Sequence, residues 1–389
     1  MLELEELVRS AGAEVVRLHL QERPEPDPAT FVGRGKLEQI RATVFDDVAD
    51  LVVFDDELTP AQQRNLEKEL EVKVIDRSGL ILDIFAQRAR SREGKLQVEL
   101  ALLEYRLPRL AGKGTALSRL GGGIGTRGPG ETKLESDRRV VRRRISRIRA
   151  ELDDLEKRRA IQRRKRQGIP MPTVSLVGYT NAGKSTLFNR LTDERTLVSR
   201  RMFATLDPLV RRLTLPSGQE ALLSDTVGFV RKLPHSLVAA FHATLEETVE
   251  AELLLHVVDL SDPSHALLAR TVSEVLEEIG ASDIPVLTVF NKTDLVDADQ
   301  LTGLPAGAAA VSARTGAGVE RLLEAIETQI SRGYRRVRMR IPFERGEVLS
   351  ALRERGRIDR TEYLPDGIEV LLSLRHADLG RFREFLCED

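Results

Sequence analysis

Two short segments of this chain contain residue types that bind a nucleotide. Residues 178–185 read Gly-Tyr-Thr-Asn-Ala-Gly-Lys-Ser, and residues 291–294 read Asn-Lys-Thr-Asp. The first has the G-x-x-x-x-G-K-S pattern of a phosphate-binding loop, in which backbone N–H groups at a helix N-terminus surround the phosphates. This loop is predicted to bind nucleotide through Gly178, Tyr179, Thr180, Asn181, Ala182, Gly183, Lys184, Ser185 and Thr186.

Individual side chains of this loop have predicted roles. Lys184 is expected to reach the β- and γ-phosphates as a catalytic residue, and the Ser185 hydroxyl to bind Mg²⁺. A strand-like run, residues 173–177, precedes the loop, and a helix is expected to begin at Ser185. This strand–loop–helix context favours a phosphate loop over a chance turn.

The second segment identifies the base. A carboxylate at Asp294 can accept hydrogen bonds from both the ring N–H and the exocyclic amine of guanine, whereas adenine offers neither there and would leave Asp294 unpaired. A further segment after the last expected strand is predicted to place backbone N–H groups near the guanine oxygen. The predicted base-reading residues are Asn291, Lys292, Asp294, Ser312, Ala313 and Arg314. Both segments together predict a GTPase that binds GTP and GDP.

Two intervening segments are expected to complete a hydrolytic site. Asp225, in Asp-Thr-Val-Gly, is predicted to hold Mg²⁺, and the N–H of Gly228 to contact the γ-phosphate. Thr205, in a first switch segment at residues 202–208, is the candidate second hydroxyl ligand of Mg²⁺, with Thr196 and Thr214 as nearby competitors. Loss of the terminal phosphate would then release both segments.

One position departs from a common GTPase pattern. Phe229 follows the Asp-x-x-Gly segment where many GTPases have a glutamine that orients the attacking water. A phenyl ring cannot bond water, so slow intrinsic hydrolysis is predicted, with a partner, a cation or backbone groups supplying the missing element. Asn181 is open to two interpretations: it recruits K⁺ as a second cofactor, or it only suits the turn.

Composition limits the class of protein. A chain of 389 residues is too long for one core, and its single cysteine, Cys387, excludes a disulfide framework. The acidic N-terminus does not resemble a signal peptide, and no apolar run is long enough for a membrane helix. We therefore expect a cytoplasmic protein without stable membrane insertion.

Charge is distributed unevenly along the chain. Residues 127–166 contain 16 Lys or Arg and 7 Asp or Glu, a net charge of +9, and the remainder has a net charge of −10 (44 basic against 54 acidic). A basic segment on an acidic chain is typical of nucleic-acid binding. The alternative is a solvated, charged helix.

The predicted fold class is α/β, beginning with a small N-terminal parallel α/β domain over residues 1–94. Strands are expected at 13–20, 51–54 and 72–75. Helices are expected at 35–45, from Pro60 to Leu70 with Thr59 as N-cap, and from about Gly79. The Gly33-Arg34-Gly35-Lys36 segment is interpreted as an ordinary strand-to-helix turn.

A long antiparallel helical hairpin is predicted over residues 95–167. Apolar residues recur every three or four positions along two segments. The first helix should end near Pro108. The two seams are Leu96, Leu100, Leu103, Leu107 and Leu110, and Val141, Ile145, Ile148, Leu152 and Leu155.

The connection between these helices, residues 111–130, is rich in glycine and basic residues. It is either a disordered tether or a basic tip on a rigid arm that approaches backbone phosphates of a partner. Under the second interpretation the residues expected to contact the partner are Arg119, Gly122, Gly123, Arg127 and Lys133.

Two further domains complete the predicted architecture. Residues 172–332 should form a P-loop GTPase domain with a doubly wound sheet, including strands near 221–224, 253–258, 285–290 and 308–311. Residues 336–389 should form a small α/β C-terminal domain with a hairpin near Pro365-Asp366-Gly367.

The chain resembles the HflX family of translation-factor-related GTPases over nearly its full length. The resemblance is carried by Phe31 to Lys36, Phe54 to Leu58, Ile84 to Ala89, Gly122 to Lys133 and Asp225 to Phe229. It implies binding to the large (50S) ribosomal subunit and its rRNA, dissociation of stalled or stressed ribosomes, GTPase stimulation by that subunit, and approach of the glycine-rich loop to the peptidyl transferase centre.

Two classes of function are compatible with these sequence features. In the first, the chain is a monomeric ribosome-binding GTPase whose basic arm contacts RNA, so binding should weaken steeply with salt. In the second, it is a signalling or self-associating GTPase whose hairpin forms protein–protein contacts. The basic segment and the absence of lipid-anchor motifs favour the first class.

Overall fold

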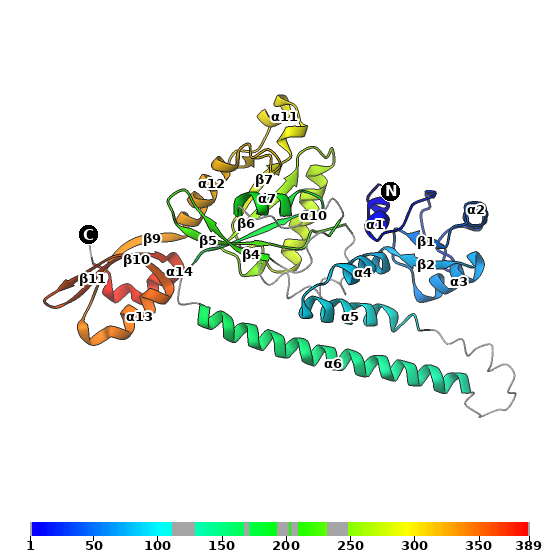
Figure 1. The fold of residues 1–389 in the computed structure, drawn as a ribbon, viewed down its shortest axis with the longest axis horizontal. Coiled ribbons are helices and arrows are strands. Elements are labelled where there is room, and N and C mark those ends of the chain that lie inside the picture. The colour runs from blue at the N-terminus through cyan, green and yellow to red at the C-terminus, as the bar shows by residue number, and fades with distance from the viewer. Residues whose placement is uncertain are drawn as a thin grey trace. The chain divides into compact units, whose positions relative to one another are not determined.

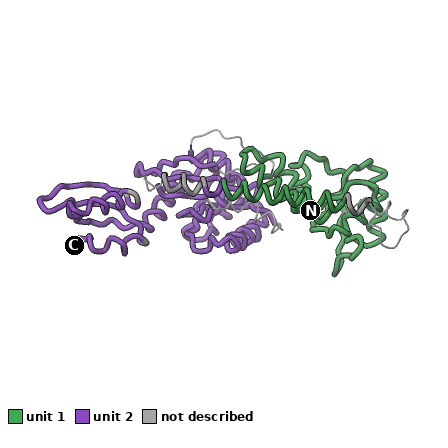
Figure 2. The backbone as a smooth tube through the Cα atoms, turned by 90° about the horizontal axis from the view of Figure 1, so that it is seen from below, with its two compact units in different colours: residues 1–154, 199–207, 232–242 green, residues 155–198, 208–231, 243–389 purple. Residues whose placement is uncertain are grey.

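The fold was analysed in a computed structural model of the 389-residue chain (Figure 1). It describes residues 2–110, 129–166, 171–192, 202–203, 209–231 and 248–387. The chain divides into two compact units, coloured separately in Figure 2. Unit 1 contains residues 1–154, 199–207 and 232–242, and unit 2 contains residues 155–198, 208–231 and 243–389.

Unit 1 begins with a small parallel α/β arrangement, as the sequence predicts. Its elements are α1 (Leu2–Ser10), α2 (Arg34–Asp46), β1 (Leu51–Phe54), α3 (Pro60–Leu70), β2 (Lys73–Asp76) and α4 (Arg77–Arg88). β1 and β2 pair in parallel. Thr59 forms the expected cap of α3, in a reciprocal capping box with Gln62. Asp76 caps α4 by accepting from the N–H of Gly79 at 2.8 Å.

The strand predicted for residues 13–20 is wrong. This segment is extended but joins no sheet. Its odd-numbered side chains bond to the α2 region instead: Arg17 pairs with Asp47, and His19 lies 3.1 Å from the Thr43 hydroxyl. The polar side of this alternating segment faces α2, whereas the apolar side chains of Val16, Leu18 and Leu20 are exposed.

The predicted helical hairpin is present; its second helix belongs to unit 1 up to residue 154 and to unit 2 from residue 155. α5 (Arg92–Arg106) ends just before Pro108, and α6 (Pro129–Arg166) is a single helix of 38 residues. Among the described residues, three ion pairs link the helices: Arg144 to Glu99 at 2.7 Å, Arg149 to Glu104 at 2.7 Å and Arg92 to Glu151 at 3.6 Å. Ile145 and Ile148 of the predicted seam are buried, which confirms the apolar spacing.

The sheet of unit 2 has six strands in the order β4-β5-β3-β6-β7-β8. All neighbours are parallel except β4 and β5. This arrangement confirms the predicted doubly wound domain and gathers the carboxyl ends of β3, β5, β6 and β7 at one edge. The strands are β4 (Leu209–Thr214), β5 (Glu220–Asp225), β3 (Thr173–Gly178), β6 (Leu253–Asp259), β7 (Val286–Asn291) and β8 (Ala309–Ala310).

Helices cover the sheet of unit 2 unequally. α7 (Lys184–Thr192) and α12 (Val319–Arg332) pack on one side, where they share a large apolar core with β3, β5 and β6. The opposite side carries α10 (His265–Glu278) and the short α11 (Ala298–Thr302), with a smaller cluster around Val258 and Phe290. A single helical turn, η3 (Thr293–Leu295), follows β7.

The end of the chain forms a three-stranded antiparallel sheet in the order β10-β11-β9. Its elements are β9 (Tyr334–Ile341), α13 (Gly346–Arg355), β10 (Gly356–Leu364) and β11 (Gly367–Arg375), and the turn between β10 and β11 is the predicted hairpin. η4 (Phe343–Arg345) precedes α13, and α14 (His376–Leu379) and η5 (Gly380–Phe385) follow β11. The four domain boundaries expected from the sequence stay a prediction.

Candidate nucleotide-binding site

The phosphate loop connects β3 to α7, as predicted from the sequence. Its tight path needs glycine: Gly183 has a φ of +96°, and a Cβ there would lie 2.3 Å from Asn291 Nδ2. Asn181 also has left-handed backbone, with a φ of 62°, and its side chain is exposed. The turn conformation alone accounts for asparagine at this position.

Lys184 lies inside the loop. Its ammonium group donates to the carbonyl oxygens of Gly178 and Tyr179, each at 2.9 Å, so the side chain folds back over the loop. Burial lowers the pKa of Lys184 to about 8, and the carboxylate of Asp225 opposes that shift. A buried cation with a lowered pKa is a natural partner for phosphate, because a nearby anion restores its preference for the charged form.

Two hard oxygen donors meet where β5 ends beside the start of α7. The Ser185 hydroxyl donates to Asp225 Oδ2 at 2.8 Å, and Asp225 is buried. A hydroxyl and a carboxylate are ligands that suit Mg²⁺. No group of three His, Cys, Asp or Glu side chains gathers in the described ranges, so phosphate oxygens and water would have to complete such a metal site.

The Asp-Thr-Val-Gly segment packs directly against the phosphate loop. The N–H of Thr180 donates to the Phe229 carbonyl at 2.8 Å, and the N–H of Phe229 donates to the Gly178 carbonyl at 3.1 Å. A Cβ on Gly228 would lie 3.0 Å from the Thr180 Cα and 3.0 Å from Lys184 Nζ. Gly228 is therefore required for this close approach.

Phe229 is itself buried, which the sequence did not predict. Its backbone, rather than its side chain, connects the two loops. Within the described part of the chain, the buried Thr180 hydroxyl beside it has no hydrogen-bond partner. A buried, unsatisfied hydroxyl in a phosphate loop is consistent with a polar ligand.

The base-reading segment is assembled from three chain regions. Asn291 donates through its amide to the Ala182 carbonyl at 2.8 Å and accepts from the N–H of Ala313 at 3.0 Å. Asp294 accepts from the Ser312 hydroxyl at 2.6 Å, and Arg314 lies 4.0 Å away. The structure thus gathers the predicted residues of 291–294 and 312–314 beside the phosphate loop.

Two positioning residues of this site were missed from the sequence. Asp259, at the carboxyl end of β6, pairs with Lys292 at 2.5 Å. Arg190 on α7 donates to the carbonyl oxygens of Ala313 and Arg314 at 3.2 Å and 2.8 Å. The sequence could have indicated Asp259, because it ends a predicted strand and the ends of neighbouring parallel strands meet at one edge of the sheet. No local sequence pattern indicates the role of Arg190.

Family comparisons agree with this geometry. Residues 1–86 match a family model described as "GTP-binding GTPase N-terminal", residues 88–166 match "GTP-binding GTPase Middle Region", and residues 173–292 match "50S ribosome-binding GTPase". A relative named GTPase HflX from Caldanaerobacter subterraneus subsp. tengcongensis is 49% identical over 387 residues, covering 99% of this chain and 89% of the relative. The chain belongs to the HflX family of GTPases.

Another HflX relative, from Escherichia coli (strain K12), is 47% identical over 378 residues, covering 96% of this chain and 88% of the relative. A solved GTP-binding protein of Sulfolobus solfataricus in complex with GDP is 28% identical, with 85% of this chain and 95% of that chain covered and a TM-score of 0.44. The family resemblance seen in the sequence is confirmed, and the chain is an enzyme that hydrolyses GTP.

Several predicted HflX residues lie outside the described residues: Thr205, the competitor Thr196, and Arg119, Gly122, Gly123 and Arg127 of the glycine-rich loop. Lys133 lies on α6, and only its backbone is described. In the described ranges, no helix is both long and apolar enough to cross a membrane.

The first switch segment gives one unexpected finding. Met202 and Phe203, predicted at its start, belong to unit 1 and are buried there. The N–H of Met202 donates to the Ser10 hydroxyl at 3.0 Å, and the Phe203 ring packs edge-on against Phe85 at 4.6 Å between centroids.

Proposed function

We propose that this HflX GTPase binds the large ribosomal subunit and its rRNA through the basic arm of α6, and that it separates stalled or stressed ribosomes. The observation that carries the proposal is a row of uncompensated charge on α6. Three arginines at helical spacings of three and four residues are exposed and have no ion-pair partner among the described residues: Arg139, Arg142 and Arg143.

Neighbouring arginines of α6 have a different role. Arg144 and Arg149 pair with glutamates of α5, and Arg147 pairs with Glu151 of α6 itself. These pairs stabilise the hairpin and leave the row at 139–143 for a partner. A cationic helix face of this kind neutralises backbone phosphates and releases counterions.

The nucleotide site supports the switch part of the proposal. Lys184 would hold the terminal phosphates, Ser185 and Asp225 would hold Mg²⁺, and Asp294 would read guanine. When bound, Mg²⁺ supplies positive charge to the phosphate oxygens. Because Phe229 is buried and cannot orient water, we propose slow intrinsic hydrolysis that the ribosome stimulates. The proposal also implies a cytoplasmic monomer.

A role for K⁺ stays a proposal. Asn181 is exposed at the loop that would surround the phosphates, although its left-handed backbone already explains the residue type. Hydrolysis is compared in K⁺ and Na⁺ at equal ionic strength. Equal rates would remove the K⁺ part of the proposal and leave the rest intact.

Sedimentation with isolated 50S subunits and a non-hydrolysable GTP analogue tests the arm. Replacement of Arg139, Arg142 and Arg143 by glutamine is expected to weaken binding and to lower the slope of log affinity against log salt by about two to three units. The matched control replaces three exposed arginines elsewhere: Arg41, Arg64 and Arg321. Equal loss in both triple variants would contradict a specific role for α6. Salt-resistant oligomers without ribosome binding would favour the self-associating GTPase instead.

A further inference from the structure

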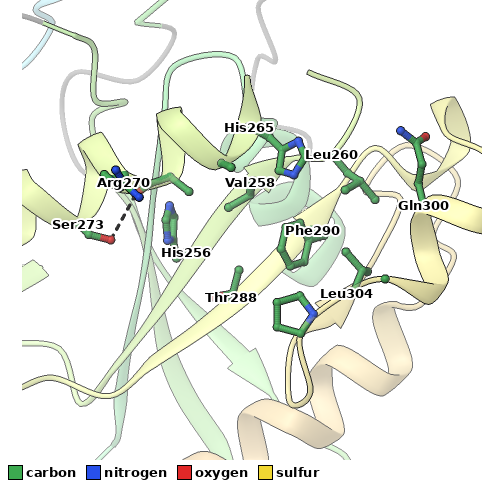
Figure 3. A pocket seen from close by; sticks show the side chains of 14 residues that line it. His256, Val258, Leu260, His265, Arg270, Ser273, Thr288, Phe290, Gln300 and Leu304 are labelled. Carbon is green, nitrogen blue, oxygen red and sulfur yellow. Dashed lines mark hydrogen bonds between the residues drawn. The ribbon is translucent and has the colours of Figure 1, made fainter. Parts of the chain in front are cut away.

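A pocket of about 580 Å³ opens in unit 2 beside the base-reading segment (Figure 3). It exists because α11 has only five residues and cannot cover the sheet face above β7. Val286, at the start of β7 on that face, is 48% exposed, because the two-residue strand β8 pairs only with Val289 and Phe290. The pocket lies between α10, β6, β7 and the turn after α11.

The floor of the pocket combines apolar side chains with one buried imidazole. β6 and β7 place His256 opposite Thr288 and Val258 opposite Phe290. His256 is 6% exposed, and in the described part of the chain its ring nitrogens make no hydrogen bond. Figure 3 shows its ring beneath α10, in the lining of the pocket. As part of the lining, the ring can offer a hydrogen bond to a molecule in the pocket.

The rim of the pocket carries positive charge. Arg270 of α10 is exposed and forms no ion pair with any described residue. His265 contributes a second imidazole, whose Nδ1 lies 2.9 Å from the Asp262 carbonyl and donates to it. The lining contains no Asp or Glu. The Arg270 guanidinium would therefore attract an anionic group at the rim, and no carboxylate of the lining would oppose it.

We propose that this pocket binds a small organic anion with a flat apolar body, its acid group at Arg270 and a hydrogen-bonding group at His256. A guanidinium binds carboxylate or sulfonate in a planar, two-point geometry. Phe290 and Leu304 provide apolar surface for the body of the ligand, and the volume is in the usual range for such ligands. None of the residues assigned to the nucleotide lines this pocket, so both ligands are compatible.

The first test uses 1-anilinonaphthalene-8-sulfonate, a fluorescent aromatic sulfonate, titrated into the full-length protein with GDP in excess. Arg270→Gln should weaken binding about tenfold, the loss expected for one charged hydrogen bond. Ala266→Trp should also weaken it, because Ala266 lines the pocket at an exposed position and a larger side chain would fill the space. Arg321→Gln on α12 is the matched control and should bind like the unmodified protein. Unchanged affinity for GDP would show that each variant is folded.

A second measurement separates anion recognition from simple apolar contact. Imidazole NMR signals of the six histidines are followed during titration with salicylate and, separately, with phenol. Salicylate should shift the signals of His256 and His265 at concentrations where phenol has little effect, and Arg270→Gln should abolish this difference. The proposal is overturned if phenol binds as tightly as salicylate, or if the dye binds Arg270→Gln and Ala266→Trp as well as it binds the unmodified protein.

Discussion

At the residue scale, Asn291 holds the nucleotide site together. Its two amide atoms bond the Ala182 carbonyl of the phosphate loop and the Ala313 N–H of the base-reading region. Neither bond requires a nucleotide, so the two halves of the site are already joined. Such preorganisation reduces the ordering cost of ligand binding.

Asp294→Asn is expected to weaken GTP binding by about a hundredfold or more, since two hydrogen bonds to a charged group, each about 1.5–3 kcal/mol, are compromised. Xanthosine triphosphate should bind the variant better than GTP, because xanthine offers a carbonyl to the amide where guanine has an amine. The Ser312 hydroxyl still has an oxygen acceptor in the variant. Calorimetry with both nucleotides measures the change; unchanged preference for guanine would contradict the assignment of Asp294.

Lys184 predicts a pH dependence of nucleotide affinity. Its pKa of about 8 in the nucleotide-free protein should rise when phosphates bind, because anions favour the charged lysine. Binding above about pH 8 must therefore take up a proton, and affinity should fall by up to about tenfold per pH unit.

Calorimetry of GDP binding in buffers of different ionisation enthalpy counts these protons. Uptake of about half a proton or more is expected near pH 8.5, and almost none near pH 6.5. Heats that do not depend on the buffer at either pH would show that Lys184 is already fully charged before binding.

At the element scale, Met202 and Phe203, the described residues between α7 and β4, belong to unit 1, whereas α7 and β4 belong to unit 2. These two residues complete the packing of unit 1 against Ser10 of α1 and Phe85 of α4. Phe203 has a φ of 56°, an unusual conformation for an aromatic residue that surrounding contacts must maintain. The start of the predicted first switch is thus part of the N-terminal unit.

Phe203→Ala is expected to destabilise unit 1 by about 3–5 kcal/mol, the usual cost of removing a buried phenyl ring. Urea unfolding gives the overall change, and hydrogen exchange of α1 and α4 peptides localises it. Phe45→Ala on α2 is the control: Phe45 is 84% exposed, so its loss should matter by less than about 0.5 kcal/mol. Similar effects of both substitutions would contradict the docking of Phe203.

At the scale of the whole molecule, the basic arm and the residues assigned to the nucleotide lie on different elements. The basic stretch of residues 127–166 is largely α6, and none of the residues assigned to the nucleotide lies on this helix. Partner binding and nucleotide binding should therefore be separable by mutation. The helix itself spans about 57 Å at 1.5 Å per residue.

Deletion of residues 121–130 is expected to abolish ribosome splitting and to leave GTP affinity unchanged. Splitting is followed by sucrose-gradient profiles of 70S ribosomes, and GTP affinity by calorimetry on the same preparation. Replacement of the same ten residues by a glycine–serine linker controls for loss of length. Loss of GTP affinity together with splitting would mean that this loop has a structural role.

Local patterns predicted most elements of the fold. Capping residues, the three- and four-residue spacing of apolar side chains and short apolar runs depend on neighbours in the chain, so α3, α6, β6 and β7 were found near their observed bounds. The strand predicted at residues 13–20 was wrong for the same reason. An alternating pattern depends on neighbours in the chain and does not show whether the segment contacts a strand or a helix, here α2.

By itself, the sequence determined the nucleotide, the order of the loops that contact it and the basic arm, because each is specified by residue types at fixed spacing. Only the tertiary structure decided that Arg190 and Asp259 brace the base-reading segment, that Phe229 is buried, and that His256 lines a pocket. These features depend on which distant residues meet at the edge and on the faces of the sheet, and spacing along one chain does not encode those contacts.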